Sequence, residues 1–442
     1  MAARRWDSFA ADAEVADVAF DAARDILGRE RMHVVVDIAR SLSREEVEHA
    51  VSGLVSAFPI LGCRYARGWW RDRWVQDRET TANDLVRVLD VAVDLDDATD
   101  EAVGEQIDPY TSWPWRVTLL RHERGSRLVV GVLHQLADAA GTLVLVKELC
   151  ARIAGEGRSR DGCTTDRGLW QVARGLPVLD LPRHSVRAAV DLLRLALTVP
   201  LLPRIEPSND AGAAGSARSR RCVTVEIDGH GGLRERCRAF GCTVNDVLIA
   251  AIAVMASEQD VTGQVSCFFT VNLRRLLRDD GPRIANLVGV GGVLLPRDSV
   301  TSLDETASLV ATRMRARKRS LPGLALVTCS ASWTGALPHA VTRRVAGLVA
   351  RMVRSFLSRG SLVTNFGVLD PFLAPLGDAV TGATVIGPHV QGISVPVISA
   401  TGFGDTLTIQ LHGNDLISPD ALERMSKRLE CLLTFSPTAE NG

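Results

Sequence analysis

One short stretch, residues 127–141, constrains what this chain can fold into more than any other. Its first half, Leu128–Leu133, is an apolar run rich in valine, which is typical of a strand buried on both faces. The run ends at His134, and Asp138 follows four residues later. The stretch therefore predicts a central strand that holds a histidine at a sheet end, where a loop on a rigid scaffold can present it to a cavity.

A histidine at such a position is a candidate general base. A neutral imidazole can take a proton from a bound nucleophile near pH 7. Asp138 is close enough in sequence for one helical turn or a tight loop to fold it back, and a buried carboxylate there needs a cationic partner. A His-x-x-x-Asp spacing also arises by chance, and a histidine beside apolar residues is more often a satisfied core group. A catalytic role for His134 therefore depends on what the rest of the chain adds.

Composition sets the broad class. With 442 residues, the chain exceeds one typical hydrophobic core, which predicts two lobes. It is 46% hydrophobic and 23% charged, and its net charge of −1 gives no general attraction to nucleic acid or an anionic membrane. The nine cysteines include no C-x-x-C pair, and no apolar run is long enough to span a membrane. We therefore expect a cytoplasmic monomer that binds no nucleic acid, crosses no membrane and holds no metal.

The first half of the chain alternates predicted strands and helices. His33–Ile38 is expected to be a strand, and the helix Ser43–Phe58 follows, opened by a Ser-x-x-Glu capping-box pattern. Trp115–Arg121 alternates like a strand that leads by a turn into the central one. A helix over Thr142–Ile153 follows the histidine loop, so this half predicts an α/β lobe.

The second half repeats this mixture of strands and long helices. A long apolar helix is expected from Thr243 to Ala256, and Asn286–Pro296 is expected to be extended. The other strands and helices predicted here are Cys222–Ile227, Gly232–Phe240, Ser266–Leu273, Ser302–Arg317, Ala340–Arg359, Ser361–Phe366, Ile393–Thr401, Thr406–His412 and Ser418–Leu433. This half therefore predicts a second α/β lobe.

The two lobes are expected to be linked by an amphipathic helix, Ser185–Leu202. Packing between the lobes is the preferred environment for this helix, with a membrane surface or a partner as the alternatives. Residues 206–221 have the composition of a linker. We therefore divide the chain into an N-terminal lobe at 1–184, an inter-lobe helix and linker at 185–221, and a C-terminal lobe at 222–442.

Several of these stretches, taken in order, resemble the CoA-dependent acyltransferase superfamily, which includes chloramphenicol acetyltransferase, condensation domains of nonribosomal peptide synthetases, polyketide-associated acyltransferases and wax ester synthases. Trp113–Gly141 resembles the central strand pair and its His-His-x-x-x-Asp-Gly loop. Two positions depart from that pattern, because Leu133 replaces the first histidine and Ala139 replaces the glycine. The other matching segments are Phe58–Leu61, Thr243–Ala256, Phe269–Arg274 and Thr364–Gly367.

This resemblance implies an α/β fold of two chloramphenicol acetyltransferase-like lobes, with a substrate tunnel between them that passes His134. An acyl thioester of CoA, or of a carrier protein's pantetheine arm, would enter from one side and a small-molecule alcohol or amine from the other. His134 would deprotonate the acceptor and then return the proton to the leaving thiolate. The resemblance implies no tightly bound cofactor, and it implies that the reaction belongs to natural-product or lipid biosynthesis.

The resemblance also assigns roles to residues around the histidine. Asp138 would support the loop through an ion pair, for which Arg274 is the best-placed partner. Gly141 would lie with Arg274 in the substrate-binding region. Asn365 and Thr364 are candidate donors to the thioester oxygen, and a strand-ending hydrogen-bond pair explains these two residues equally well.

The predicted helix Ala340–Arg359 carries arginines beside an apolar stripe and leads into a strand expected to line the tunnel. Both possible donors bring phosphate groups to the tunnel mouth, and arginine suits phosphates. Arg351 and Arg354 are therefore candidates for donor binding, with a solvated basic face as the competing explanation. The stripe comprises Val341, Val345, Leu348, Met352 and Phe356.

Two alternatives stay open. Leu133 and Ala139 favour either a relative in which His134 catalyses another reaction, such as cyclisation or dehydration, or a non-catalytic module that docks a carrier protein. The intact His134 and Asp138 argue against the second alternative. An assay of thioester consumption with a candidate acceptor separates all three functions.

Overall fold

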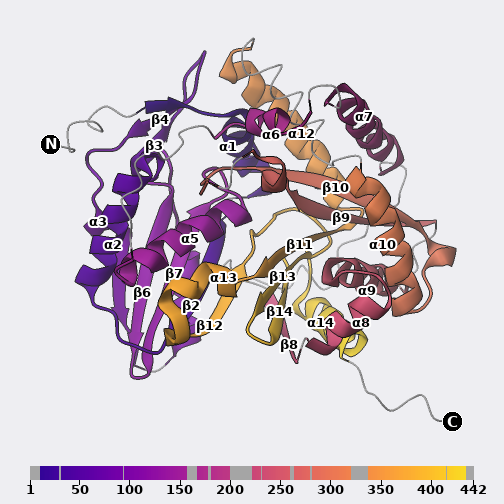
Figure 1. Cartoon of the computed structure of the whole chain (residues 1–442). Helices are drawn as coiled ribbons and strands as arrows, with labels where there is room; N and C mark the ends of the chain where they lie inside the picture. The colour runs from indigo at the N-terminus through magenta and orange to yellow at the C-terminus, as the bar shows by residue number, and fades with distance from the viewer. Residues whose placement is uncertain are drawn as a thin grey trace.

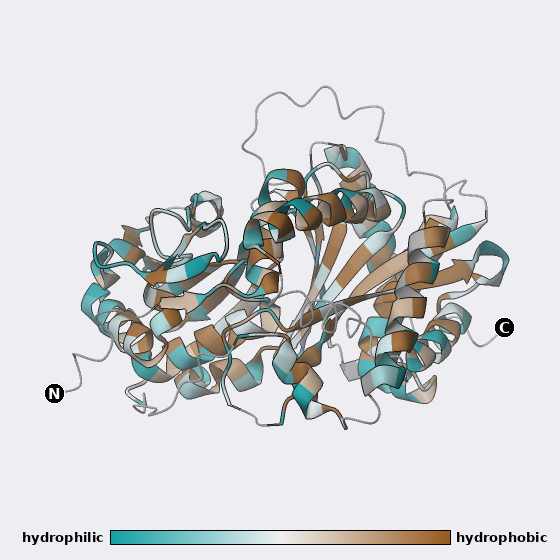
Figure 2. Ribbon diagram, turned by 90° about the horizontal axis from the view of Figure 1, so that it is seen from above, coloured by the Kyte–Doolittle hydropathy of each residue, from teal (hydrophilic) through white to brown (hydrophobic). Residues whose placement is uncertain are grey.

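The computed structural model places two large sheets beside each other, each with helices packed against it, and a small third sheet at one end (Figure 1). Hydrophobic segments run along the strands that lie between the helices (Figure 2). The predicted α/β class is confirmed. The structure describes residues 10–28, 31–92, 94–156, 167–177, 181–199, 222–229, 231–258, 263–278, 281–319, 337–414 and 416–434.

The five-stranded sheet is centred on β7 (Gly125–Leu133), the strand that leads to His134. β7 pairs antiparallel with β2 (Arg31–Ile38) on one side and with β6 (Trp115–His122) on the other. The apolar run of β7 is buried throughout and contributes to a core on each face of the sheet. The predicted doubly buried strand is therefore confirmed. The outer strands are β5 (Val86–Asp90) and β12 (Val380–Ile386).

Helices cover both faces of this sheet. α2 (Arg44–Ala57) and α5 (Ala139–Ile153) share a core with β7 on one face, and α4 (Leu95–Gly104) packs on the other. α2 begins with the predicted capping box, in which Ser43 and Glu46 each accept the other's backbone N–H. The small sheet contains β1 (Ala10–Asp12), β4 (Arg73–Gln76) and β3 (Cys63–Ala66), and α3 (Ala82–Leu85) and α6 (Trp170–Gly175) are short helices.

α5 begins at Ala139, earlier than the predicted Thr142. The Asp138 side chain caps this helix by accepting the Gly141 N–H at 2.8 Å, which satisfies one of the N–H groups that a helix start leaves open. Ala139 is consequently the first helical residue, where an ordinary right-handed backbone is required. Alanine in place of the glycine of the resembling family is therefore compatible with this loop.

The six-stranded sheet has the strand order β10-β9-β11-β13-β14-β8. Its core is filled largely by α9 (Val244–Glu258), which is buried over most of its length. The strand predicted from Ile393 begins later, at Val397, because Pro396 has no N–H to donate to a neighbouring strand. The remaining elements here are β8 (Cys222–Asp228), α8 (Gly231–Ala239), β9 (Gln264–Asn272), β10 (Val288–Pro296), α10 (Leu303–Arg319), β11 (Ser361–Val368), α13 (Asp370–Leu373), β13 (Val397–Phe403), β14 (Thr406–His412) and α14 (Pro419–Leu433).

Two segments from the second half of the chain pack against the first half. β12 forms an edge of the five-stranded sheet by pairing antiparallel with β2. α12 (His339–Leu357) packs along α1 (Val15–Leu27), and Ala23 and Ala350 lie in the core that they share. The first sheet thus includes chain from beyond residue 222, and the lobe boundaries stay a prediction.

The inter-lobe helix is α7, which spans Leu181–Thr198. Val199, just beyond its end, packs in the same core as Ala350 of α12. One apolar stripe of α7 faces solvent, so the expected packing between lobes is wrong for that face. The predicted linker, 206–221, lies outside the described residues. The exposed stripe comprises Val186, Val190, Leu193 and Leu197.

No single helix in the described part of the chain combines the length and the apolarity that crossing a bilayer requires. Taken together, α8 and α9 reach that length and composition, but their axes are bent by 88° at the break between them. α9 owes its apolar character to its place inside the core.

Candidate active site

The loop between β7 and α5, residues 134–138, carries the two residues of the predicted motif. Its histidine end is held by a side chain from a distant part of the sequence. Oδ1 of Asn286 lies 3.2 Å from Nδ1 of His134, and Nδ2 of Asn286 donates to the backbone oxygens of His134 and Gln135 at 2.8 and 3.1 Å. Phe20 of α1 stacks on the half-buried imidazole, with ring centroids 4.0 Å apart and planes inclined by 20°. Among the described residues, none forms a hydrogen bond with Nε2 of His134.

The aspartate end of the loop is held by charge. Nη1 of Arg274 lies 2.8 and 2.9 Å from the two carboxylate oxygens of Asp138, so the predicted pair is confirmed. The backbone N–H groups of Leu287 and Gly141 also donate to this carboxylate, at 2.7 and 2.8 Å. Asp138 is only 3% exposed, and a carboxylate buried to this extent is tolerable because it is both paired and hydrogen-bonded.

A second buried arginine supports the middle of the loop. Arg167 donates to the backbone oxygens of Leu136 and Ile284 at 2.9 and 2.7 Å. It also pairs with Asp17 of α1 at 2.8 Å, and both side chains are almost fully buried. This arginine therefore ties the loop to α1 and to the segment that precedes β10.

The loop lies where the two large hydrophobic cores meet. Ala137 belongs to the core of the five-stranded sheet and Ala285 to the core of the six-stranded sheet, and the Asp138 N–H donates to the Ala285 oxygen at 3.3 Å. β11 crosses between the same cores, because Val363 lies in the second and Phe366 packs against the first. Both the histidine loop and the middle of β11 therefore lie between the two sheets.

Thr364 and Asn365 are half-buried in this crossing part of β11. Oδ1 of Asn365 accepts the Gly367 N–H at 2.8 Å, beside a register shift in the pairing with β13. The left-handed backbone at this shift is taken by Gly367, with a φ of 81°. The amide oxygen of Asn365 is thus used within the strand end, and its NH₂ group is the part that can donate to a substrate oxygen. The roles of Thr364 and Asn365 toward the thioester stay a prediction.

Gly141 lies against the polar groups that hold Asp138. A Cβ at this position would come within 2.9 Å of the Ala285 oxygen and 3.0 Å of Nη2 of Arg274. Side chains rarely approach so closely, so glycine permits the contact between α5 and the segment before β10. The structure gives Gly141 a packing role, and its contact with a substrate stays a prediction.

Arg351 and Arg354 are both exposed on α12. Nη1 of Arg354 lies 3.4 Å from the Ile26 oxygen of α1. The neighbouring apolar stripe is exposed in part, because Leu348 and Met352 are 59% and 51% exposed. The outer face of α12 is therefore basic and apolar together, and donor binding by its arginines stays a prediction.

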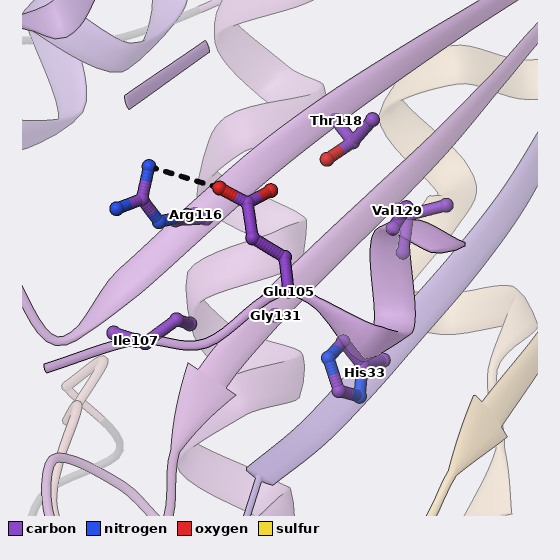
Figure 3. A pocket seen from close by; sticks show the side chains of 8 residues that line it. His33, Glu105, Ile107, Arg116, Thr118, Val129 and Gly131 are labelled. Atoms are coloured by element: carbon purple, nitrogen blue, oxygen red, sulfur yellow. Dashed lines mark ion pairs between the residues drawn. The ribbon is translucent and has the colours of Figure 1, made fainter. Parts of the chain in front are cut away.

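A small pocket lies on the side of the five-stranded sheet that faces α4, away from α5 (Figure 3). Arg116 and Glu105 form an ion pair of 3.3 Å at this pocket, and His33 and Gly131 face each other across the pairing of β2 with β7. The pocket contains none of the predicted site residues, and the tunnel past His134 stays a prediction. Within the described residues, no three His, Cys, Asp or Glu side chains gather closely enough to hold a metal ion.

Three residues around the histidine were not anticipated from the sequence, namely Asn286, Phe20 and Arg167. The sequence predicts Asn286 only as the start of an extended segment, and the one signal for another role is its place as a polar residue between Ala285 and Leu287. Such a residue in an apolar run needs a hydrogen-bond partner when it is buried. That partner is 152 residues away, so the sequence could indicate the need but not the contact.

Comparisons with known proteins agree on the fold. No protein-family model matches this chain. The uncharacterized protein Rv2305 of Mycobacterium tuberculosis is 25% identical over 357 residues, covering 74% of this chain and 79% of that protein. The polyketide synthase associated protein 5 of Mycobacterium tuberculosis has a similar structure, with a TM-score of 0.64, 15% identity and coverage of 96% of this chain and 98% of that one.

An acetyltransferase and a condensation domain are also among the similar structures. The trichothecene 15-O-acetyltransferase of Fusarium sporotrichioides superposes with a TM-score of 0.69 at 14% identity, covering 96% of this chain and 95% of that one. The first condensation domain of the calcium-dependent antibiotic synthetase superposes with a TM-score of 0.66 at 16% identity, with coverage of 96% and 95%. The chain therefore has the fold of condensation domains and of this acetyltransferase.

Proposed function

We propose that this protein transfers an acyl group from a thioester to an alcohol or amine acceptor. The observation that carries the proposal is the setting of His134. Its imidazole lies at the end of a buried strand, Nδ1 is engaged by Asn286, and no described residue is hydrogen-bonded to Nε2. A fold shared with an acetyltransferase and with condensation domains supports the same class of reaction.

In this proposal, Nε2 of His134 takes the proton of the acceptor while the acceptor oxygen or nitrogen attacks the thioester carbonyl. A C–O or C–N bond forms, the C–S bond breaks, and His134 passes the proton to the leaving thiolate. Thr364 and Asn365 are proposed to donate hydrogen bonds to the carbonyl oxygen as it gains negative charge. Neither a covalent acyl-enzyme nor a bound cofactor is required.

The donor is proposed to be an acyl-CoA or an acyl carrier protein, in natural-product or lipid biosynthesis. Both donors carry phosphate, and Arg351 and Arg354 on the outer face of α12 supply exposed guanidinium groups. The similarity to a polyketide synthase associated protein and to condensation domains supports a carrier-bound donor in particular.

A second candidate function is a different reaction at the same histidine. Structures with this fold include an epimerization domain and a cyclization–docking bidomain, at TM-scores of 0.64 and 0.63. The same Nε2 could then move a proton on a tethered intermediate without transferring an acyl group.

The proposal is tested by following thiol release from a panel of acyl-CoA and acyl-pantetheine thioesters, with and without alcohol and amine acceptors. His134→Ala should lower the acceptor-dependent rate by about 10²–10⁴ without changing the thermal unfolding midpoint substantially. His49→Ala is the matched control, because His49 is exposed on α2, and it should retain full activity. Equal turnover in a folded His134→Ala protein would exclude acyl transfer by this histidine.

A further inference from the structure

We infer that Asn286 is a positioning residue that selects the tautomer of His134, with the proton on Nδ1 and the lone pair on Nε2. The inference about the tautomer rests on hydrogen-bond geometry alone. Its consequence for the rate rests on the proposed acyl transfer.

The direction of the Asn286 amide follows from its backbone contacts. One end of the amide lies 2.8 and 3.1 Å from the carbonyl oxygens of His134 and Gln135. A carbonyl oxygen can only accept, so the group that faces both oxygens must be the NH₂ group. Rotating the amide by 180° would place three oxygens together, and the amide oxygen is therefore the atom that faces His134.

The tautomer follows from the direction of the amide. Oδ1 of Asn286 lies 3.2 Å from Nδ1 of His134, and an amide oxygen cannot donate. Nδ1 must therefore carry the hydrogen, whether the imidazole is neutral or charged. In the neutral form this leaves the lone pair on Nε2, the nitrogen to which no described residue is hydrogen-bonded.

Phe20 restricts the orientation of the His134 ring. It stacks on the imidazole with centroids 4.0 Å apart, which restricts rotation of the ring about its bond to Cβ. Asn286 is 3% exposed, and its two backbone contacts hold the amide in place independently of the imidazole. The amide is thus preorganised before a substrate binds, and a preorganised partner orients a base more effectively than a mobile one.

The primary test is the ¹⁵N NMR spectrum of the imidazoles, which distinguishes protonated from unprotonated ring nitrogens. The His134 signals are assigned by their loss in His134→Ala. In its neutral form, His134 of the wild-type protein should show Nδ1 protonated and Nε2 unprotonated. A wild-type spectrum with the neutral proton on Nε2 overturns the inference, and this measurement needs no activity and no variant of Asn286.

Asn286→Ala should shift the His134 signals toward a mixture of tautomers and lower kcat by roughly 10- to 100-fold, by analogy with the removal of groups that orient metal-ligating histidines. KM should change little. Asn414→Ala is the matched control, because Asn414 is buried and donates to the oxygens of Val390 and Ile393 at 3.2 and 2.7 Å, as Asn286 does to its own pair. It should lower stability without altering the His134 signals. An unchanged tautomer in a folded Asn286→Ala protein would reject the inference.

Asn286→Asp supplies a second variant that keeps an acceptor toward Nδ1–H. Its other carboxyl oxygen replaces the NH₂ group and faces the carbonyl oxygens of His134 and Gln135, so this variant should be less stable than the wild-type protein. In the folded protein the carboxyl oxygen next to the imidazole still accepts from Nδ1–H, so the tautomer should be retained and part of kcat rescued relative to Asn286→Ala. A proton on Nε2 of neutral His134 in folded Asn286→Asp contradicts the assigned contact. If the wild-type tautomer is as inferred but no acceptor is acylated, the proposed function fails while the inference stands.

Discussion

The two ends of the loop between β7 and α5 are held by different chemistry. At one end a fully buried carboxylate, Asp138, meets the guanidinium of Arg274 and two backbone N–H groups. At the other end a half-buried imidazole, His134, meets a neutral amide and a phenyl ring. The loop is therefore anchored by charge at its helix end and oriented by neutral groups at its strand end.

This difference suits the two ends of the loop to two different tasks, folding stability at the charged end and the proposed catalysis at the neutral end. A buried charge binds its partner firmly, because removing either one leaves the other unpaired in a poorly solvated place. The general base proposed at His134, by contrast, must change its charge during the reaction. A fixed cation beside His134 would oppose the imidazolium, and a fixed anion would stabilise it before reaction. A neutral amide orients the ring without biasing either state, so we expect Asp138 to govern folding and Asn286 to govern rate.

The largest effect on stability should come from breaking the charged end. Asp138→Ala should lower the free energy of unfolding by about 3–5 kcal/mol, measured by urea denaturation, because the partly buried Arg274 is then left without its counter-charge. Arg274→Ala should cost a similar amount. The double variant should be much more stable than the sum of the single losses predicts, and additive losses would mean that the pair is not coupled.

An exposed ion pair provides the control for that experiment. Arg44 and Glu48 on α2 approach to 2.6 Å, and the Arg44 side chain is 48% exposed. Arg44→Ala should therefore cost only about 0.2–1 kcal/mol. A loss as large as that of Asp138→Ala would show that burial is not what distinguishes the two pairs.

A smaller loss of folding stability should follow from crowding the Asp138–Arg274 pair without removing either residue. Gly141→Ala places a Cβ within 3.0 Å of Arg274 and of the Ala285 oxygen, and overpacking of this kind typically costs about 1–3 kcal/mol. Gly232→Ala in α8 is the control, because a Cβ there meets no atom within 4 Å, and it should be neutral or slightly stabilising. Equal thermal stability of the two variants would remove the packing role assigned to Gly141.

The smallest effect should lie outside the loop altogether. Arg351→Glu together with Arg354→Glu should raise the KM for the thioester donor by roughly two- to tenfold, the range expected of two exposed charge contacts, and leave the KM for the acceptor unchanged. The effect should fade as salt screens the charges. An unchanged donor KM at low salt would mean that these arginines form only a solvated surface and do not bind the donor.

The sequence by itself determined the parts of this protein that depend on neighbours along the chain. The buried run of β7, the position of His134 at its end and the capping box of α2 follow from local patterns of apolar and polar residues. The Asp138–Arg274 pair could also be foreseen, because a buried carboxylate requires a cation and the resemblance to a known family indicated which one.

Only the tertiary structure decided which distant segments meet. Phe20 reaches His134 from the first described helix and Asn286 from 152 residues further along the chain, and β12 joins a sheet formed otherwise by the first half. A neutral amide and a phenyl ring have no charge that demands one particular partner, so their contacts are set by how the two cores pack together. The exposure of the apolar stripes on α7 and α12 also depends on the tertiary structure. An apolar stripe in the sequence indicates a preference for burial, but the packing of all the helices determines which stripe is covered.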